Sequence, residues 1–177
     1  MIQEFIMNRL LSFKGQTIEQ LRKRGAVIGE DVHLLSSNID GGTSCLVEIG
    51  NHVTITGATI LAHDASTKMY LGYTKIAKTT IGDYVFIGVG SIVLPGVTIG
   101  NNVIVGAGSV VRDSIPDNSV VMGNPARIIC ATDEYIEKNR ERMKQVPIYN
   151  KPVREMDMVE KLAMREAINE HGGGYEI

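Results

Sequence analysis

The chain has 177 residues, enough for one domain with a sizeable hydrophobic core and a short tail. Its formal net charge is −2 at pH 7 and its pI is about 6.1, so it lacks the basic footprint of a nucleic-acid-binding protein. No apolar run reaches the roughly 18 residues that cross a bilayer, and the start lacks the pattern of a signal peptide. The two cysteines, Cys45 and Cys130, lie far apart and are expected to be free thiols. These features favour a cytoplasmic protein that neither binds nucleic acid nor inserts into a membrane.

Residues 1–24 precede the regular part of the chain and are expected to form one or two short helices. Such helices would cover the open end of the structure that follows, where unpaired strand edges would otherwise be exposed.

A six-residue repeat begins weakly at 28–33, resumes at 49–66 and is strict from 81 to 111. In the strict part, isoleucine or valine recurs at every sixth position: Ile81, Ile87, Val93, Ile99, Val105 and Val111. Glycine follows this residue in four of the six units. The fifth position of the units holds small or β-branched residues.

This spacing has a direct structural interpretation. A β-branched residue at every sixth position suits a strand, points inward and stacks on its equivalent in the next turn. Glycine beside it permits a positive φ or a close backbone approach at a corner. Three strand-and-corner units make a coil of triangular cross-section that buries its face only against neighbouring coils, as in any solenoid. An ordinary sandwich would instead space its strands irregularly, by about 8–12 residues.

The repeat is interrupted just after His63. Ile81 follows Leu61 by 20 positions, which is not a multiple of six, so a segment must leave the coil. The stretch 67–78, which carries two tyrosines and three lysines, is expected to be extruded as a loop. Loops on a rigid scaffold often carry binding groups, although a tolerated surface insertion is the alternative.

After residue 130 the repeat gives way to a charged pattern that is typical of helices. The sequence therefore predicts a helical cap at 1–24, a solenoid at 25–130 and a helical extension at 131–177.

The repeat units, such as "IGDYVF" and "IGNNVI", and the closing motif "GNPAR" at 123–127 resemble the hexapeptide signature of left-handed parallel β-helix acyltransferases. The resemblance covers roughly residues 28–129 and is nearest in look to bacterial sugar and polysaccharide O-acetyltransferases. It implies an all-β, left-handed parallel β-helix that assembles as a homotrimer. It also implies active sites between neighbouring β-helices, with acetyl-CoA as co-substrate and no metal.

The segment "ILAHDAS" resembles the catalytic segment of sugar O-acetyltransferases, in which one histidine is the base, and this makes His63 the candidate. An imidazole with a pKa near 6.5 can take the proton of a hydroxyl as that hydroxyl attacks a thioester. Asp64 follows directly and is assigned either to the substrate or to orienting the imidazole. Successive side chains on a strand point to opposite faces, so the orienting role would require a corner at this point.

The resemblance also assigns residues to acetyl-CoA. The backbone around Gly88 and Val89 would supply an N–H donor to the oxyanion, and Ala107 and Gly108 would line the pantetheine arm through their backbone.

Two arginines are candidates for the phosphates of CoA. Arg127 is the basic residue of the closing motif, Arg112 is the second candidate, and a guanidinium suits bidentate phosphate binding. The family commonly has a Thr-Lys pair where this chain has Arg112 and Asp113.

The acceptor groove would be lined by Ser37 and Asp40 from "SSNIDGG" and by Tyr70 or Tyr73 of the loop. The favoured function is an acetyl-CoA-dependent O-acetyltransferase that acts on a saccharide hydroxyl.

Three alternatives remain open. A nucleotide-sugar N-acetyltransferase would use similar groups on the same scaffold. A γ-class carbonic anhydrase would need three histidines on zinc, and here only His52 and His63 could take part. The third is a β-helix protein without catalytic activity.

Overall fold

The computed structural model describes residues 16–177. The chain divides into two compact units, the first ending at Thr132 and the second beginning at Asp133. Most of the predicted helical cap lies outside the described residues. Its described part contains helix α2 (Ile18–Lys23), which Thr17 caps and which buries Leu21. Of the helices that the structure describes, none has both the length and the apolar character to cross a membrane.

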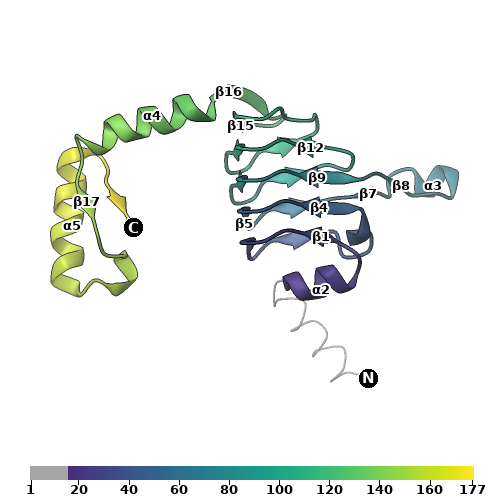
Figure 1. Cartoon of the computed structure of the whole chain (residues 1–177), viewed down its shortest axis with the longest axis horizontal. Coiled ribbons are helices and arrows are strands. Elements are labelled where there is room, and N and C mark those ends of the chain that lie inside the picture. The colour runs from purple at the N-terminus through teal and green to yellow at the C-terminus, as the bar shows by residue number, and fades with distance from the viewer. Residues whose placement is uncertain (1–15) are drawn as a thin grey trace, which may run out of the picture. The chain divides into compact units, whose positions relative to one another are not determined.

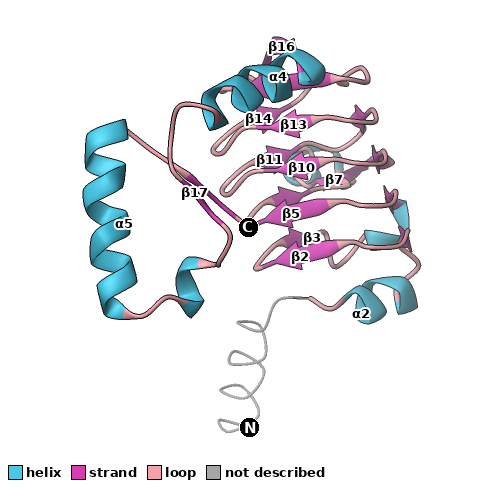
Figure 2. Cartoon of the chain, turned by 60° about the vertical axis from the view of Figure 1, so that its left-hand side comes forward, coloured by secondary structure: helices cyan, strands magenta, loops and turns pink. Residues whose placement is uncertain are grey.

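The first unit is a parallel solenoid with three faces (Figures 1 and 2), as the repeat predicted. The first face contains β1 (Val27–Ile28), β4 (Val47–Ile49), β9 (Thr79–Ile81) and β12 (Thr98–Ile99). The second face contains β2 (His33–Leu35), β5 (Thr54–Thr56), β10 (Phe86–Ile87), β13 (Ile104–Val105), β15 (Ser119–Met122) and the antiparallel β16 (Arg127–Ala131). The third face contains β3 (Asn38–Ile39), β6 (Thr59–Ile60), β11 (Ile92–Val93) and β14 (Val110–Val111).

The isoleucine and valine residues that recur at every sixth position form the core. On the third face, Ile39, Ile60, Val93 and Val111 stand in one register, and each is at most 1% exposed. Burying one such side chain contributes about 1.5–3 kcal/mol. The core of this unit is therefore a stack of β-branched side chains, repeated once per coil.

The corner between the first and second faces explains the glycine that follows the repeated isoleucine or valine. A Cβ on Gly82 would lie 2.8 Å from the carbonyl oxygen of Gly100 in the next coil, so only glycine fits without a backbone shift. Two residues later in each coil the backbone is left-handed, with φ from 51° to 56° at Asp31, His52, Tyr84, Asn102 and Asn118. These side chains stand outward in one row, and the rings of His52 and Tyr84 stack with centroids 4.6 Å apart.

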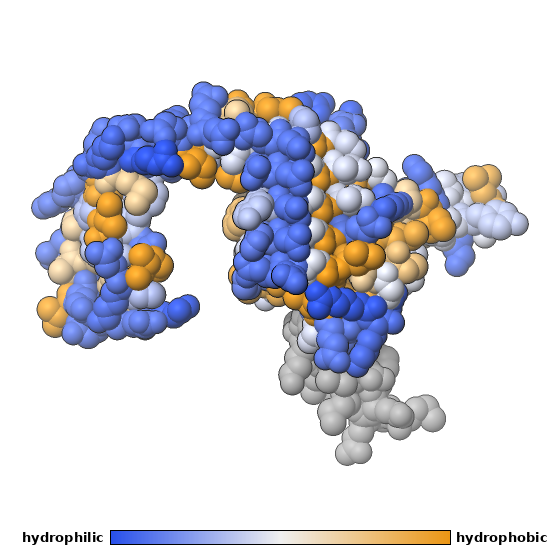
Figure 3. Space-filling model, in the orientation of Figure 1, coloured by the Kyte–Doolittle hydropathy of each residue, from blue (hydrophilic) through white to orange (hydrophobic). Residues whose placement is uncertain are grey.

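The chain leaves the coil between β6 and β9 as a projecting arm, residues 63–76 (Figure 1). The arm is an antiparallel ribbon of β7 (His63–Asp64) and β8 (Lys75–Ile76), with helix α3 (Lys68–Leu71) at its tip. The excursion begins four residues earlier than the predicted loop, because β7 and β8 pair with each other rather than with the coil. Apolar side chains are exposed at the tip (Figure 3), with Met69 85% and Leu71 67% exposed. Before β4, the short 3-10 helix η1 (Ser44–Leu46) makes the corresponding turn of the first coil.

The second unit covers Asp133–Ile177 and is built around helices. It contains most of α4 (Thr132–Met143), then β17 (Ile148–Tyr149), the 3-10 helix η2 (Val153–Glu155), α5 (Met158–His171) and β18 (Tyr175–Glu176). Strands β17 and β18 pair in parallel, and α5 begins at a capping box formed by Asp157 and Glu160. Every residue of this unit is described, and Met156 is the one buried hydrophobic residue among them.

Candidate active site

The candidate site lies at the corner between the third and first faces. One residue directly follows each strand of the third face: Asp40, Leu61, Leu94 and Arg112. The strand residues that precede them are in register. The four residues therefore form a column along the solenoid, one per coil. Neighbouring strands are about 4.8 Å apart, so Leu61 and Arg112, two coils apart, are separated by roughly 10 Å along the axis.

His63 is held at this corner by the carboxylate of Asp40 from the coil before it. Oδ2 of Asp40 accepts the backbone N–H groups of Ala62 at 2.9 Å and His63 at 3.1 Å. The same oxygen contacts Nδ1 of the His63 imidazole. The Asp40 side chain is 2% exposed, whereas that of His63 is 39% exposed. The carboxylate is thus buried beneath a ring whose far edge reaches solvent.

The charge state of Asp40 fixes the tautomer of the ring. Burial raises the pKa of Asp40, but hydrogen bonds from Ala62, Thr43 and His63 outweigh it and hold the pKa at about 2. An ionised carboxylate can only accept hydrogen bonds, so Nδ1 carries the proton that it donates to Asp40. Nε2 is then left with its lone pair and can act as a base.

A cavity of about 570 Å³ lies beside this ring. Its apolar lining consists of Leu61, Ala65, Leu94 and Pro95. Its polar lining consists of His63, Asp64, Lys75 and Arg112. The cavity therefore runs from His63 along an apolar strip to an arginine two coils further on.

Asp64 does not orient the imidazole. Its Oδ1 accepts the backbone N–H of Ser66 at 2.9 Å. Hydrogen bonds from Ser66 and, to a smaller extent, the charge of Lys75 lower the pKa of Asp64, so this carboxylate is ionised. The orienting role belongs to Asp40. Asp64 lines the cavity beside His63 and stays a predicted substrate contact.

Two residues assigned to the acceptor groove are buried instead. Ser37 is 5% exposed and donates its hydroxyl to the carbonyl oxygen of Ile55 at 2.7 Å. Asp40 is buried beneath the imidazole, as described above. Neither side chain can line a groove on the surface, so both of these predictions are corrected.

Four residues assigned to acetyl-CoA lie at a different corner of the chain. Gly88 and Val89 follow β10, Ala107 and Gly108 follow β13, and both pairs precede strands of the third face. His63 lies at the opposite edge of that face. The amide of Gly88 donates to Val105 O at 2.8 Å and that of Gly108 donates to Val89 O at 2.9 Å, so the coil already uses both N–H groups. Gly88 is therefore corrected as an oxyanion donor, and within one chain none of the four lines the cavity beside His63.

The structure brings the two predicted phosphate ligands together. Nε of Arg112 lies 3.2 Å from Oδ2 of Asp113, and a guanidinium nitrogen of Arg127 lies 3.6 Å from the same oxygen. The antiparallel strand β16 returns the chain so that Arg127 reaches this carboxylate. Two positive charges thus share one negative charge, and Arg112 also lines the cavity.

The two tyrosines of the arm are not part of the cavity lining. Tyr70 is 84% and Tyr73 is 80% exposed, and both lie toward the tip of the arm. Within one chain the structure does not bring them to His63.

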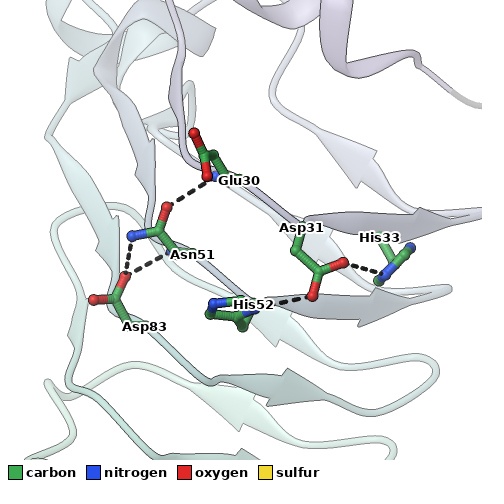
Figure 4. A network of polar contacts seen from close by, with 6 residues as sticks. All are labelled: Glu30, Asp31, His33, Asn51, His52 and Asp83. Atoms are coloured by element: carbon green, nitrogen blue, oxygen red, sulfur yellow. Dashed lines mark hydrogen bonds and ion pairs between the residues drawn. The ribbon is translucent and has the colours of Figure 1, made fainter.

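A second polar cluster lies at the corner between the first and second faces (Figure 4). Asp31 lies between two histidines, 3.1 Å from Nε2 of His33 and 2.9 Å from Nδ1 of His52. Beside it, Asn51 bonds to Glu30 and Asp83 of the neighbouring coils. Within residues 16–177, no three or more His, Cys, Asp or Glu side chains are grouped so that they could hold a metal ion.

Comparisons with known proteins agree with this architecture. Residues 78–113 match the family profile described as "Bacterial transferase hexapeptide (six repeats)". Protein CapG of Staphylococcus aureus is 44% identical over 127 residues, which cover 68% of this chain and 74% of CapG. The putative acetyltransferase YvoF of Bacillus subtilis is 42% identical over 94 residues, and the match spans 52% of each chain.

Solved structures show the same fold. A maltose O-acetyltransferase from Clostridium difficile has a TM-score of 0.50 and 30% identity, over 72% of this chain and 84% of that one. The hexapeptide-repeat acetyltransferase VCA0836 from Vibrio cholerae has a TM-score of 0.52 at 21% identity, over 67% and 84% of the two chains, and bears on the fold alone. The chain belongs to the bacterial hexapeptide-repeat transferase family. Its fold is the left-handed parallel β-helix that the resemblance implied. Its class of enzyme is acetyltransferase.

Proposed function

We propose that this chain transfers an acetyl group from acetyl-CoA to a hydroxyl of a saccharide, with His63 as the general base and Asp40 as its positioning residue. One observation carries the proposal: the imidazole turns Nδ1 toward a buried, ionised carboxylate and lines a cavity. The name of the maltose O-acetyltransferase, which is 30% identical to this chain, supports a sugar hydroxyl as the acceptor.

The chemistry follows from the tautomer. Nε2 of His63 takes the proton of the acceptor hydroxyl while the oxygen attacks the thioester carbonyl. The resulting imidazolium is stabilised by Asp40, which stays ionised, and negative charge develops on the carbonyl oxygen. When the tetrahedral intermediate collapses, the C–S bond breaks and the thiolate takes the proton from Nε2. The ester and CoA leave, and no covalent enzyme intermediate is needed.

The cavity supports acetyl-CoA as the donor. A flexible, largely apolar pantetheine arm suits the strip formed by Leu61 and Leu94 between His63 and Arg112. With the thioester at His63, the phosphates would lie toward Arg112 and Arg127. Their shared carboxylate, Asp113, keeps the two guanidiniums together and competes with a phosphate for them.

The groups that line the other corner of the third face would come from a second copy of the chain. In a homotrimer, Val89, Ala107 and Gly108 of one copy would complete the site around His63 of its neighbour. Val89 is 62% exposed and replaces Gly88 as the candidate for the N–H that receives the oxyanion.

The test is acetyl-CoA turnover by His63→Ala, measured as CoA release with a panel of plain sugars and amino-sugar nucleotides. Loss of the general base is expected to lower kcat by about 10²–10⁴-fold. His52→Ala is the matched control, because His52 lies at another corner, and it should retain the wild-type rate. Equal rates for His63→Ala and wild type would dismiss His63 as the base. Turnover confined to amino-sugar nucleotides would replace the hydroxyl acceptor with an amine.

A further inference from the structure

The arm carries two lysines and a third, Lys78, follows it, and the structure gives the three different environments. Nζ of Lys78 is 2.7 Å from a carboxylate oxygen of Glu48, so its charge is paired. Lys68 begins helix α3 at the tip of the arm, outside the cavity lining. Lys75 lines the cavity together with His63. Among residues 16–177, no carboxylate oxygen lies within 4.0 Å of the Lys75 ammonium.

The nearest candidate partner for Lys75 is Asp64, directly opposite it in the β7–β8 ribbon. The two charges interact, because Lys75 lowers the pKa of Asp64. However, Oδ1 of Asp64 accepts the Ser66 amide at 2.9 Å, which directs this carboxylate to the turn that follows it. Lys75 therefore places in the cavity a cation that has no ion-pair partner within residues 16–177.

Lys75 and Arg112 line the same cavity from different elements of the chain. Arg112 is two coils above Leu61, roughly 10 Å along the axis. Lys75 belongs instead to the ribbon that starts at His63 itself. The acceptor hydroxyl must reach Nε2 of His63, and Lys75 lines the same cavity from the strand that pairs with β7.

We propose that Lys75 selects an acceptor that carries a negative charge close to the hydroxyl that is acetylated. The charge is the carboxylate of an acidic sugar or the phosphate of a sugar phosphate, and this inference rests on the proposed function. A charge-assisted hydrogen bond from an ammonium to an anion is about twice as strong as a neutral one. A neutral sugar would leave the ammonium without its anion, and sites built around such a contact reject analogues that lack it.

The experiment measures kcat and KM with three matched acceptors: glucose, glucuronate and glucose 1-phosphate. Wild type is expected to favour a charged acceptor over glucose, and comparison of the two charged acceptors identifies the source of the charge. Lys75→Gln should raise the KM for the charged acceptor by about 10–100-fold and abolish the preference. The KM for acetyl-CoA should not change. Lys75→Arg should keep the preference, and Lys68→Gln, which changes a lysine outside the cavity, should match wild type.

Three results would overturn the inference. Wild type could use glucose as well as both charged acceptors, or Lys75→Gln could leave the preference intact. The variant could also raise the KM for acetyl-CoA alone, which would assign Lys75 to the donor. In the first two cases a loss of turnover in His63→Ala would leave the proposed function standing. If no acceptor is turned over, an NMR titration with glucuronate and glucose 1-phosphate decides, and equal affinities of wild type and Lys75→Gln contradict the role of Lys75.

Discussion

At the scale of single residues, one oxygen atom organises the site. Oδ2 of Asp40 receives two backbone N–H groups and the imidazole of His63. The backbone bonds fix the carboxylate relative to the corner of the next coil, and the carboxylate in turn fixes the ring. A buried charge is costly unless it is paired and hydrogen-bonded. These three donors meet that condition, so Asp40 can remain ionised with little solvent contact.

Because of this arrangement, the free energy of unfolding depends on pH in the acidic range. The pKa of Asp40 is about 2 in the folded chain against an ordinary value of 3.8, so the folded state favours the ionised form. The resulting contribution, about 2 kcal/mol, is complete above pH 4 and is lost as pH falls from about 4 to about 2.

Chemical denaturation of wild type and Asp40→Asn across that window checks this prediction. The free energy of unfolding of wild type should fall by about 2 kcal/mol more than that of Asp40→Asn between the two ends of the window. Parallel pH profiles for the two proteins would show that Asp40 does not hold the charge assigned to it.

The role of Asp40 illustrates what sequence alone leaves open at this scale. His63 is a candidate because it stands at the break in the repeat, within a segment that resembles the catalytic segment of sugar O-acetyltransferases. Asp40 is 23 positions earlier, and its contact with His63 depends on the register between β3 and β6. The signal was present, since "NID" at 38–40 aligns with "TIL" at 59–61, which places Asp40 in line with Leu61. The burial of Asp40 and Ser37 depends on how the corner folds, which six-residue spacing does not specify.

At the scale of elements, the repeat determines the strands and leaves the excursions undetermined. Most strands of the solenoid have only two or three residues, and they persist because each coil stacks on its neighbours. The isoleucine and valine residues that recur at every sixth position from Ile81 to Val111 are all buried, as the sequence predicted. The arm interrupts the six-residue repeat, and its bounds follow from the pairing between β7 and β8. No periodicity in the sequence encodes that pairing, so the predicted loop began too late.

The corners show a second limit of the repeat. In the six-residue pattern, all glycines that follow the repeated isoleucine or valine look equivalent. In the structure they lie at different corners of the coil. Gly82 turns the chain between the first and second faces, whereas Gly88 turns it between the second and third. A motif match therefore located the predicted oxyanion and pantetheine residues on the chain without showing that they lie across the third face from His63.

At the scale of the whole molecule, one chain carries His63 and the apolar strip at one corner and the small residues at another. Closed cyclic oligomers use the same two surfaces of every copy. If each site takes His63 from one copy and the corner around Ala107 from the next, two different inactive variants can complement each other.

Mixed trimers test this arrangement. His63→Ala removes the proposed base, and Ala107→Trp, at an exposed position, should obstruct the other half of the site. Each homotrimer is expected to be inactive. Random mixing in equal amounts should leave about one quarter of the sites with both halves intact, and so about one quarter of the wild-type rate. Mixtures that stay inactive although trimers form would place the whole site within one chain.

In the proposed mechanism, an ionised Asp40 holds His63 in the tautomer that leaves Nε2 free to act as a base. Long-range ¹H–¹⁵N NMR of the histidine rings in mildly alkaline buffer observes this directly and requires no knowledge of the acceptor. The resonances of His63 are those that disappear in His63→Ala. We predict a protonated Nδ1 and an unprotonated Nε2 in wild type, with the preference lost in Asp40→Ala. A proton on Nε2 in wild type, or a tautomer that does not respond to Asp40→Ala, would contradict this mechanism.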